Sequence, residues 1–424
     1  MYKLIADIFL TVLVISCITF LIMYLPRLYA WICSFKKPEH IVNEKQNKLA
    51  FLIPARNESS VIGDLFDSFE AQTYKNFDVF VLVKDENDKT VEMSKRINAK
   101  VYVMPNQTCK GDVLDFSLKH IIKEYPKIHD AFIIVDADCT LEKHFAEEMN
   151  NALASGRHIV TTKKIVKNYL SKNKNANSIW SCCNGLIWPL IDDLGNKYKS
   201  DKNIVNMTIG TGLMLRADVI KELGGWPYRE TLTEDIELMY DCVLRDYTTY
   251  YSPFAKIYVE ESTDHNMTNK RRKRWLTGVV DSKRLYMKRL YKKRKDRHSK
   301  QNFYFTTALL PVFSFVAFLC AYFFLTLFIS VVLGLLKNPF ALTFFWLSSL
   351  SFIILYISFF VMSLFCILAD RKNINLPFYK KIIILFMHPF FYMEYIPIIF
   401  RAIAGSDNKD WEVIEREESL FKKG

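Results

Sequence analysis

Three short charged motifs occur in a fixed order along the chain, and their residue types suit the chemistry of phosphates and sugars. They are Asp136-Ala137-Asp138, Thr233-Glu234-Asp235 and Arg271-Arg272-Lys273-Arg274-Trp275. Two carboxylates that flank one small residue can bind a single Mg²⁺ or Mn²⁺ ion, and such an ion binds a diphosphate. A carboxylate at a helix start can accept a proton, and arginines neutralise phosphate oxygens. The three motifs together predict an enzyme that moves a sugar from a nucleotide donor to an acceptor hydroxyl.

Each side chain of the second and third motifs has an expected role. Asp235 is the expected general base, with Glu234 as second choice, because inverting sugar transfer needs one carboxylate that deprotonates the acceptor. Arg274 and Arg271 are expected to neutralise the departing diphosphate, while Trp275 stacks against the acceptor sugar. Taken singly, each motif also has an ordinary structural explanation: a turn, a helix cap or a membrane-surface helix. Their combination favours the catalytic interpretation.

Three further positions are expected to complete the ligand site. Asp85 follows a predicted strand and can accept hydrogen bonds from a uracil ring or a ribose. Lys110, followed by Gly111, precedes a predicted helix and can reach a phosphate or the base. Gly210-Thr211-Gly212 permits a tight backbone turn, which we place near the acceptor.

Alternating strands and helices must position these residues. Short apolar runs predict strands, and apolar positions three or four apart predict helices. The alternation predicts a mostly parallel sheet with helices on both faces, whose ligands bind beyond the carboxyl ends of the strands. Residues 163–205 show no clean period, and we expect an acceptor-side helix and a mobile loop there. The predicted strands are 49–54, 77–83, 99–104, 131–135 and 157–161, and the predicted helices start at Ser59 or Ser60, at Val113 and at Thr233.

Long uncharged runs flank this middle region. Residues 8–26, 303–336 and 338–369 carry no charged side chain, and a bilayer crossing needs about 20 apolar residues. Residues 382–400 are a weaker candidate because histidine, proline and glutamate interrupt them. The positive-inside rule places the basic residues after the first and third runs, and the domain between the runs, in the cytoplasm. We therefore expect a multi-pass protein of the inner or plasma membrane.

These observations divide the chain into five parts. They are an N-terminal transmembrane segment with its linker, a catalytic domain, basic interfacial helices, a C-terminal transmembrane region and a tail. The boundaries are 1–44, 45–265, 266–302, 303–404 and 405–424.

The positive charge of the chain is concentrated in one stretch. The net charge is +12, and residues 270–300 hold 15 Lys or Arg against two acids, Asp281 and Asp296. A basic stretch beside a membrane segment is expected to contact anionic lipid headgroups, so we expect membrane lipids and no nucleic acid as partners. The nine cysteines form no Cys-x-x-Cys pair, and we expect reduced thiols.

The ordered motifs resemble those of the membrane-bound family 2 glycosyltransferases. That group includes the bacterial synthases of poly-N-acetylglucosamine, hyaluronan and cellulose, and the ceramide glucosyltransferases. The tail at 411–416, Trp-Glu-Val-Ile-Glu-Arg, is similar to the W-x-x-T-x-R ending of the poly-N-acetylglucosamine type. The resemblance covers roughly residues 45–290 and rests on I-P-A-R-N-E (53–58), Asp85, K-G (110–111), D-A-D (136–138), G-T-G (210–212), T-E-D (233–235) and R-R-K-R-W (271–275).

The resemblance implies a GT-A (Rossmann-like) α/β domain in the cytoplasm, joined to α-helical transmembrane segments, and an inverting mechanism without a covalent intermediate. It implies a UDP-sugar donor, with Asp85 at the uridine and Asp138 as the direct metal ligand. Arg274 and Trp275 would close a Q-x-x-R-W motif. Position 271 carries Arg where that motif has Gln, which leaves processive synthesis open.

Several functions remain open at this point. The leading one is extension of a β-linked polysaccharide such as poly-N-acetylglucosamine, and the first alternative is addition of a single sugar to a membrane lipid. A membrane scaffold without activity and a nucleic-acid-binding membrane protein are the other two. The sugar, the linkage and any partner subunit are not specified by the sequence.

Overall fold

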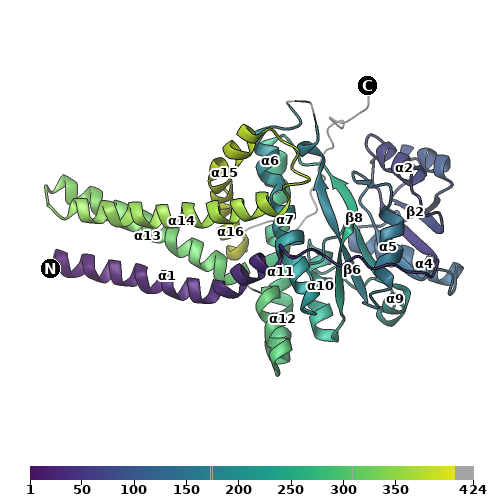
Figure 1. Ribbon diagram of the computed structural model, residues 1–424, viewed down its shortest axis with the longest axis horizontal. Helices are drawn as coiled ribbons and strands as arrows, with labels where there is room; N and C mark the ends of the chain where they lie inside the picture. The colour runs from purple at the N-terminus through teal and green to yellow at the C-terminus, as the bar shows by residue number, and fades with distance from the viewer. Residues whose placement is uncertain (172, 174, 308, 406–424) are drawn as a thin grey trace.

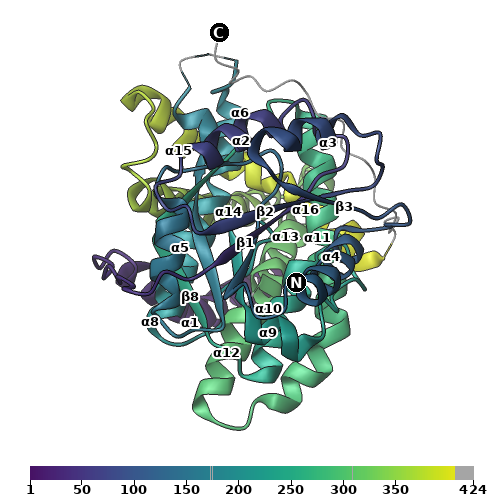
Figure 2. The same cartoon turned by 90° about the vertical axis from the view of Figure 1, so that its right-hand side faces the viewer.

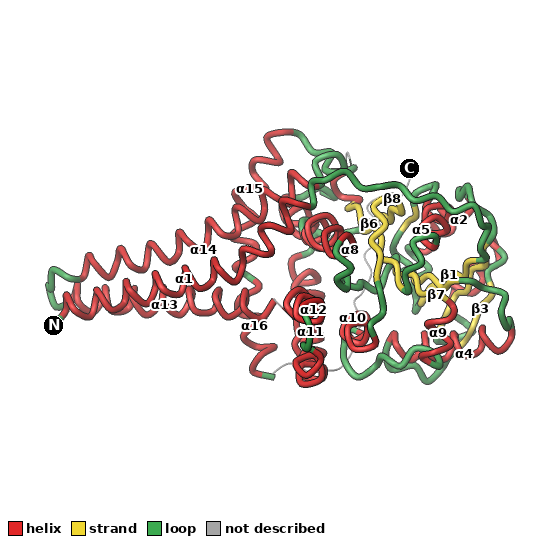
Figure 3. The backbone as a smooth tube through the Cα atoms, turned by 60° about the horizontal axis from the view of Figure 1, so that its bottom comes forward, coloured by secondary structure: helices red, strands yellow, loops and turns green. Residues whose placement is uncertain are grey.

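The computed structural model describes residues 1–171, 173, 175–307 and 309–405, and it has two parts (Figure 1). One part is a β-sheet covered by helices, and the other is an arm of three long helices. Figure 3 shows these helices side by side, with the N-terminus at the far tip: α1 (Tyr2–Cys33), α13 (Leu309–Leu335) and α14 (Ala341–Ala369). An α/β domain joined to long apolar helices is thus confirmed. The Trp411–Arg416 tail motif lies outside the described residues.

One mixed sheet of eight strands forms the centre of the first part. Its strand order is β3-β2-β1-β4-β7-β6-β8-β5. The neighbours from β3 to β4 pair in parallel, whereas β7 runs antiparallel to both β4 and β6. The strands are β1 (Leu49–Pro54), β2 (Phe77–Val83), β3 (Lys100–Val103), β4 (Ala131–Ile134), β5 (Thr140–Leu141), β6 (Ile159–Val166), β7 (Leu213–Arg216) and β8 (Thr249–Val259).

Apolar cores cover both faces of the central strands. Side chains alternate between the two faces along each strand, so one strand contributes to both cores. In β1, Phe51 and Ile53 join one apolar core with α2 (Ile62–Glu70), while Ala50 and Leu52 join a second core with α4 (Lys110–Glu124). Figure 2 shows helices on both sides of the central strands. The continuous apolar runs of β1 and β4 are therefore typical of strands that are covered twice.

Most helices of the α/β part are short and connect the strands, and α11 is long. They are α2 (Ile62–Glu70), α3 (Lys89–Ser94), α4 (Lys110–Glu124), α5 (Phe145–Leu153), α6 (Ile179–Gly185), α7 (Ile187–Ile191), a π-helical turn η3 (Asp192–Asn196), α8 (Lys197–Asp201), α9 (Ala217–Leu223), α10 (Glu234–Arg245), α11 (His265–Lys293) and α12 (Arg297–Thr307), with 3₁₀ turns at Lys95–Ile97 and Lys167–Tyr169.

Several local predictions were wrong. The first short helix begins at Ile62 behind Val61, so neither Ser59 nor Ser60 caps it. Strand β6 continues through Lys163 and Lys164 into the stretch where we expected a helix and a mobile loop, and the remainder of that stretch is mostly helical. Pattern analysis treats lysine as exposed, whereas both lysines are buried here with acidic partners. Strands β7 and β8 were not predicted.

Within the described residues, four helical segments are long and apolar enough to cross a membrane. They are Tyr2–Cys33, Ser314–Leu335, Ala341–Ala369 and Phe378–Ala404. The first three form the arm, and large apolar side chains such as Phe324 and Phe328 are exposed on it, each by 67%. Such a surface is expected where lipid covers it. The predicted run 303–336 is divided, because its first residues belong to α12.

The fourth segment differs from the arm. It consists of α15 (Phe378–Met393) and α16 (Tyr395–Ala404), which meet at Glu394. Figure 1 shows both at the base of the arm, where α15 packs on α6 and α16 packs on α11.

Candidate active site

A cavity of about 980 Å³ joins the sheet to the base of the arm. Its first end lies at the carboxyl edge of β1 and β4, and we call it the donor end because the expected donor-binding residues Lys110 and Asp136 line it. Its second end is lined by side chains of α1, α13, α14 and α16. Most predicted site residues line this cavity: Lys110, Asp136, Asp138, Gly210, Thr211, Glu234, Asp235, Arg271, Arg274 and Trp275.

The antiparallel strand β7 brings two of the predicted motifs together. Leu213 pairs with Ile134, so the loop before β7 lies beside the residues that follow β4. The Asp136 N–H donates to the Thr211 hydroxyl over 3.1 Å, and the Gly212 N–H donates to the Ile134 carbonyl over 2.9 Å. The Gly210–Gly212 loop therefore lies beside Asp136 at this end of the cavity, and its contact with the acceptor stays a prediction.

Lys110 links the donor carboxylates to the expected catalytic ones. Its Nζ lies 2.6 Å from Asp136 Oδ1 and 3.7 Å from Glu234 Oε1, and it donates to the Gly210 carbonyl over 3.2 Å. Burial alone would lower the pKa of Lys110, but the charges of Asp136 and Glu234 outweigh burial and raise it. Lys110 is therefore a fixed cation between the two acidic motifs.

Asp235 is held at the start of α10 by backbone donors. Its Oδ2 accepts from the Gly210 N–H over 2.8 Å, and its Oδ1 accepts from the Ile236 N–H over 2.9 Å. Burial, followed by the charge of Glu234, raises the pKa of Asp235 to about 7, against the lowering effect of Lys110. A carboxylate with a pKa near 7 is a better proton acceptor at neutral pH than an ordinary one.

The Gly210–Gly212 loop, called the catalytic loop below because it contacts the expected base Asp235, leaves little room for side chains. A Cβ atom there would lie 2.9 Å from the Lys110 ammonium and 3.3 Å from a Glu234 oxygen. At position 212 the backbone has a φ of +66°, and a Cβ would collide with the Thr162 hydroxyl. The spacing of Gly210 and Gly212 thus permits the close approach of Lys110, Asp136 and Asp235.

Helix α11 presents one face to the cavity and another to α15 and α16. Arg271, Arg274 and Trp275, spaced as neighbours on a helix, line the cavity. Arg271 lies 3.8 Å from the buried Glu261 and stacks over Trp275 at 5.2 Å. Arg272 points the other way and lies against the rings of Phe391 and Tyr395, which fixes α11 to the base of the arm.

One predicted residue lies elsewhere. Asp85 is an exposed turn residue that accepts hydrogen bonds from the Asn87 N–H and side-chain amide, and it is not among the residues that line the cavity. The turn after β2 therefore does not bring the Asp85 carboxylate to the cavity in this structure, and its contact with uridine stays a prediction.

Two cavity-lining residues had no predicted role in the sequence analysis, although Asn57 belongs to the I-P-A-R-N-E motif. Gln107 is buried, lines the donor end and has an unpartnered side-chain nitrogen within the described part of the chain. Asn57, in the loop after β1, has a φ of +58° and donates its N–H to Asp88. A glutamine in a loop has no diagnostic pattern, so only the fold places Gln107 here.

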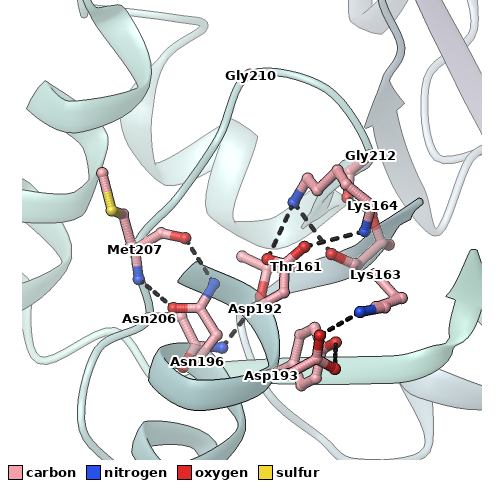
Figure 4. A network of polar contacts seen from close by, with 12 residues as sticks. Thr161, Lys163, Lys164, Asp192, Asp193, Asn196, Asn206, Met207, Gly210 and Gly212 are labelled. Carbon is pink, nitrogen blue, oxygen red and sulfur yellow. Dashed lines mark hydrogen bonds and ion pairs between the residues drawn. The ribbon is translucent and has the colours of Figure 1, made fainter. Parts of the chain in front are cut away.

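A layer of buried charge supports the catalytic loop from behind (Figure 4). Lys164 lies 3.6 Å from Asp192, and Lys163 pairs with Asp193 and, over 2.8 Å, with Asp370 at the end of α14. The neighbouring Thr162 donates to the Gly212 carbonyl over 2.9 Å. Strand β6 therefore connects α14 with the loop that binds Asp235.

The Asp136 and Asp138 carboxylates fit a divalent cation as partial ligands. Their hard oxygens suit Mg²⁺ or Mn²⁺, and both lie at the donor end of the cavity. Among the described residues, no group of three or more His, Cys, Asp or Glu is placed to hold a metal ion. A diphosphate and water would therefore supply the remaining ligands, as is usual for Mg²⁺ at phosphate sites.

Comparisons with known proteins agree with this fold. In curated proteins, the chain is similar to the poly-beta-1,6-N-acetyl-D-glucosamine synthases of Staphylococcus aureus strain COL, at 23% identity over 249 residues, and of Staphylococcus epidermidis, at 21% over 248 residues. These matches cover 57% of this chain and 57% or 56% of the relatives, so the chain spans little more than half of their length.

Among solved structures, the chain is similar to a mannosyltransferase from Pyrobaculum calidifontis, PcManGT, determined in complex with GDP-Man and Mn²⁺. The TM-score is 0.55 at 16% identity, covering 88% of this chain and 99% of the other. The sequence profile described as glycosyltransferase like family 2 matches residues 46–278, more than half of the chain. The chain therefore belongs to glycosyltransferase family 2.

Proposed function

We propose that this glycosyltransferase is embedded in a membrane and transfers a sugar from a UDP-sugar to an acceptor hydroxyl, with inversion at the anomeric carbon. The observation that carries the proposal is the joint fixation of Asp136 and Asp235. Both contact the Gly210–Thr211 loop, one through Thr211 and the other through Gly210. A donor held at Asp136 and an acceptor deprotonated by Asp235 would therefore meet at one loop.

The chemistry follows from the residues around this loop. Asp235 takes the proton from the acceptor hydroxyl, and the oxygen of that hydroxyl attacks the anomeric carbon in line. The bond from that carbon to the diphosphate oxygen breaks, and the electron pair leaves with the diphosphate. Arg274 and Arg271 lie on α11 where they would neutralise this charge. Asp138 and Asp136 would hold a divalent ion, which supplies further neutralisation of the leaving group.

The donor and the orientation have separate support. A UDP-sugar is what the motif resemblance implies, whereas the Pyrobaculum enzyme was solved with GDP-Man, so both nucleotides belong in the test. Gln107 at the donor end offers a free amide nitrogen to the base. The basic residues at 270–300 and after α14 lie on the side of the arm where the sheet lies, which supports a cytoplasmic catalytic domain.

Two acceptors fit the cavity. The growing polysaccharide expected from the sequence is supported by the names of the staphylococcal relatives. Transfer of a single sugar to a membrane lipid is supported by the apolar lining of the second end of the cavity, which includes Val316, Phe359, Met362 and Ile399. Polymer paths need hydroxyl-binding and stacking groups, whereas aliphatic side chains suit acyl or prenyl chains. The aliphatic part of the lining suits a lipid chain, whereas rings at the same end, such as Trp31, Tyr392 and Tyr395, suit a sugar polymer, so product length decides.

The test is release of nucleoside diphosphate by the detergent-purified protein with a panel of UDP- and GDP-sugars, in Mg²⁺ or Mn²⁺, with membrane lipids present. We expect turnover of one donor that stops when the metal is chelated. The products are then sized, since long chains indicate a synthase and a lipid carrying one sugar indicates single transfer. Turnover that persists in Asp235→Asn would remove Asp235 as the base.

A second variant tests the donor end separately. Asp138→Ala should raise the metal concentration needed for donor binding by at least about tenfold, because one of two protein carboxylates is lost. The matched control is Glu142→Ala, which removes a nearby carboxylate that does not line the cavity. An unchanged metal requirement in Asp138→Ala would exclude this residue as a ligand.

A further inference from the structure

The second end of the cavity contains two cations that the catalytic proposal does not use. Arg27 is near the end of α1, and Lys199 is in α8, where α1 reaches the α/β part. Both line the cavity together with apolar side chains such as Trp31, Leu194 and Phe305. The two basic groups therefore lie at the boundary between the membrane arm and the sheet domain.

Neither cation has a counter-charge in the part of the chain that the structure describes. No ion pair to an acidic side chain is formed by Arg27 or Lys199 within those residues, and the Arg27 Nε is buried without a hydrogen-bond partner. Lys199 is only 8% exposed. Burial and then the charge of Arg27 lower the pKa of Lys199 to about 7. Each cation thus raises the energy of the other, and no neighbouring carboxylate offsets it.

A buried cation without a counter-charge is costly. Lys199 is such a cation and lies beside the half-buried Arg27, so a ligand is expected to supply the anion. Phosphate is suited to this role, because it carries up to two negative charges and offers several oxygens to guanidinium and ammonium donors. Apolar walls adjoin the pair, and these match the chains of a lipid rather than water. The location at the arm's base is also the level at which lipid headgroups lie.

We propose that Arg27 and Lys199 bind the phosphate of an amphipathic lipid whose apolar chains occupy the second end of the cavity. That this lipid carries the acceptor hydroxyl to Asp235 rests on the proposed function; the phosphate site itself does not. The donor diphosphate has its own cations at the other end, Arg274 and Lys110. The acceptor class is accordingly a phosphate-bearing lipid.

The test compares lipids that differ by the phosphate alone. Native mass spectrometry of the full-length protein in a neutral detergent would be used to titrate dioleoyl phosphatidic acid and dioleoylglycerol. We expect phosphatidic acid to bind at a concentration at least about tenfold lower than dioleoylglycerol, because two charge-assisted contacts are added. Arg27→Gln with Lys199→Gln should remove this preference and leave dioleoylglycerol binding unchanged.

Controls assign the source of the anion. Lys197→Gln changes a lysine of the same helix that does not line the cavity, and it should retain the preference. Inorganic phosphate at low millimolar concentration should not displace phosphatidic acid; if it does, the pair binds soluble anions and the lipid proposal is wrong. Displacement by UDP would assign the pair to the donor diphosphate and would also overturn it.

The outcome is independent of the catalytic proposal. If the wild-type protein prefers phosphatidic acid and turns over no donor sugar, the lipid site stands and the transfer function fails. If it turns over a donor but binds both lipids equally, the transferase function stands and the phosphate site fails. Thermal unfolding of the double variant without lipid gives a folding check, since removing two uncompensated cations should not lower the unfolding midpoint.

Discussion

The donor end and the second end of the cavity differ in whether acidic side chains compensate the charge of a buried lysine. At the donor end, Lys110 is surrounded by Asp136 and Glu234, and its pKa is raised. At the second end, Lys199 faces Arg27, and its pKa is lowered to about 7. A balanced cluster keeps its geometry without a ligand, whereas an unbalanced one gains most when an anion binds.

The layer behind the catalytic loop extends this comparison. Lys163 is as buried as Lys199, but it pairs with Asp193 and Asp370. Its pKa is raised, since those two charges outweigh the opposing effect of burial. Lys163 and Lys199 are thus buried to a similar degree but differ in their partners. Only Lys163, which pairs with two carboxylates, stabilises the fold.

The largest effect is expected for the general base. Asp235→Asn should reduce the rate of sugar transfer by about 10³-fold, within the range for loss of a general base. Donor affinity should change by less than about twofold, because the amide still accepts from the Gly210 N–H. Initial rates and donor titration measure the two quantities. Glu234→Gln is the comparison: a larger loss in that variant would transfer the role of base to Glu234.

Removing one partner from the balanced layer should be nearly as severe. Asp192→Asn leaves Lys164 buried without its carboxylate and should lower the free energy of unfolding by about 3 kcal/mol. Thermal or denaturant unfolding in detergent measures the change. The exposed ion pair between Lys95 and Glu92 offers a control. Glu92→Gln removes one partner of this pair and should change the free energy of unfolding by less than about 0.5 kcal/mol.

The pH dependence of transfer tests the environment of Asp235. Its raised pKa of about 7 means that the carboxylate is protonated, and inactive as a base, below that pH. The specific rate should therefore fall about tenfold for each pH unit below 7 and level off above it. Rates between pH 5.5 and 8.5 at saturating metal measure this; a rate that stays level down to pH 5.5 would contradict the assigned base.

The smallest effect is expected at the unbalanced end. Lys199→Met should stabilise the lipid-free protein by about 1 kcal/mol, as removal of an unfavourable functional charge often does. The pKa of Lys199 is lower in the folded than in the unfolded protein, so the unfolded chain binds more protons between pH 7 and about 10.4. The destabilisation of the wild type by this buried charge therefore decreases as the pH rises through that range. The stabilisation by Lys199→Met should therefore be largest below pH 7 and vanish near pH 10.5. Destabilisation at pH 6.5 would show that Lys199 has a structural role.

The sequence specified the parallel half of the sheet well, because β1 and β4 are continuous apolar runs and β2 is apolar from Val79 to Val83. It did not specify β7, a four-residue strand whose antiparallel pairing with β4 depends on contacts distant in the chain. Pattern analysis also excluded Lys163 and Lys164 from a strand, since their acidic partners are about 30 residues away. The acidic motifs were found by spacing, whereas the burial of Gln107 and Lys199 is a property of the packed fold.

If α14 crosses a bilayer as proposed, the ion pair between Lys163 and Asp370 connects that membrane helix to the Gly210–Gly212 loop. Helix α14 has 29 residues, more than the roughly 20 needed to cross the hydrocarbon layer, so its tilt must adapt to membrane thickness. Asp370 lies at the end of α14. Its partner Lys163 adjoins Thr162, which donates a hydrogen bond to the Gly212 carbonyl. In the proposed membrane-embedded protein, a change in bilayer thickness would therefore reach the catalytic loop through this ion pair.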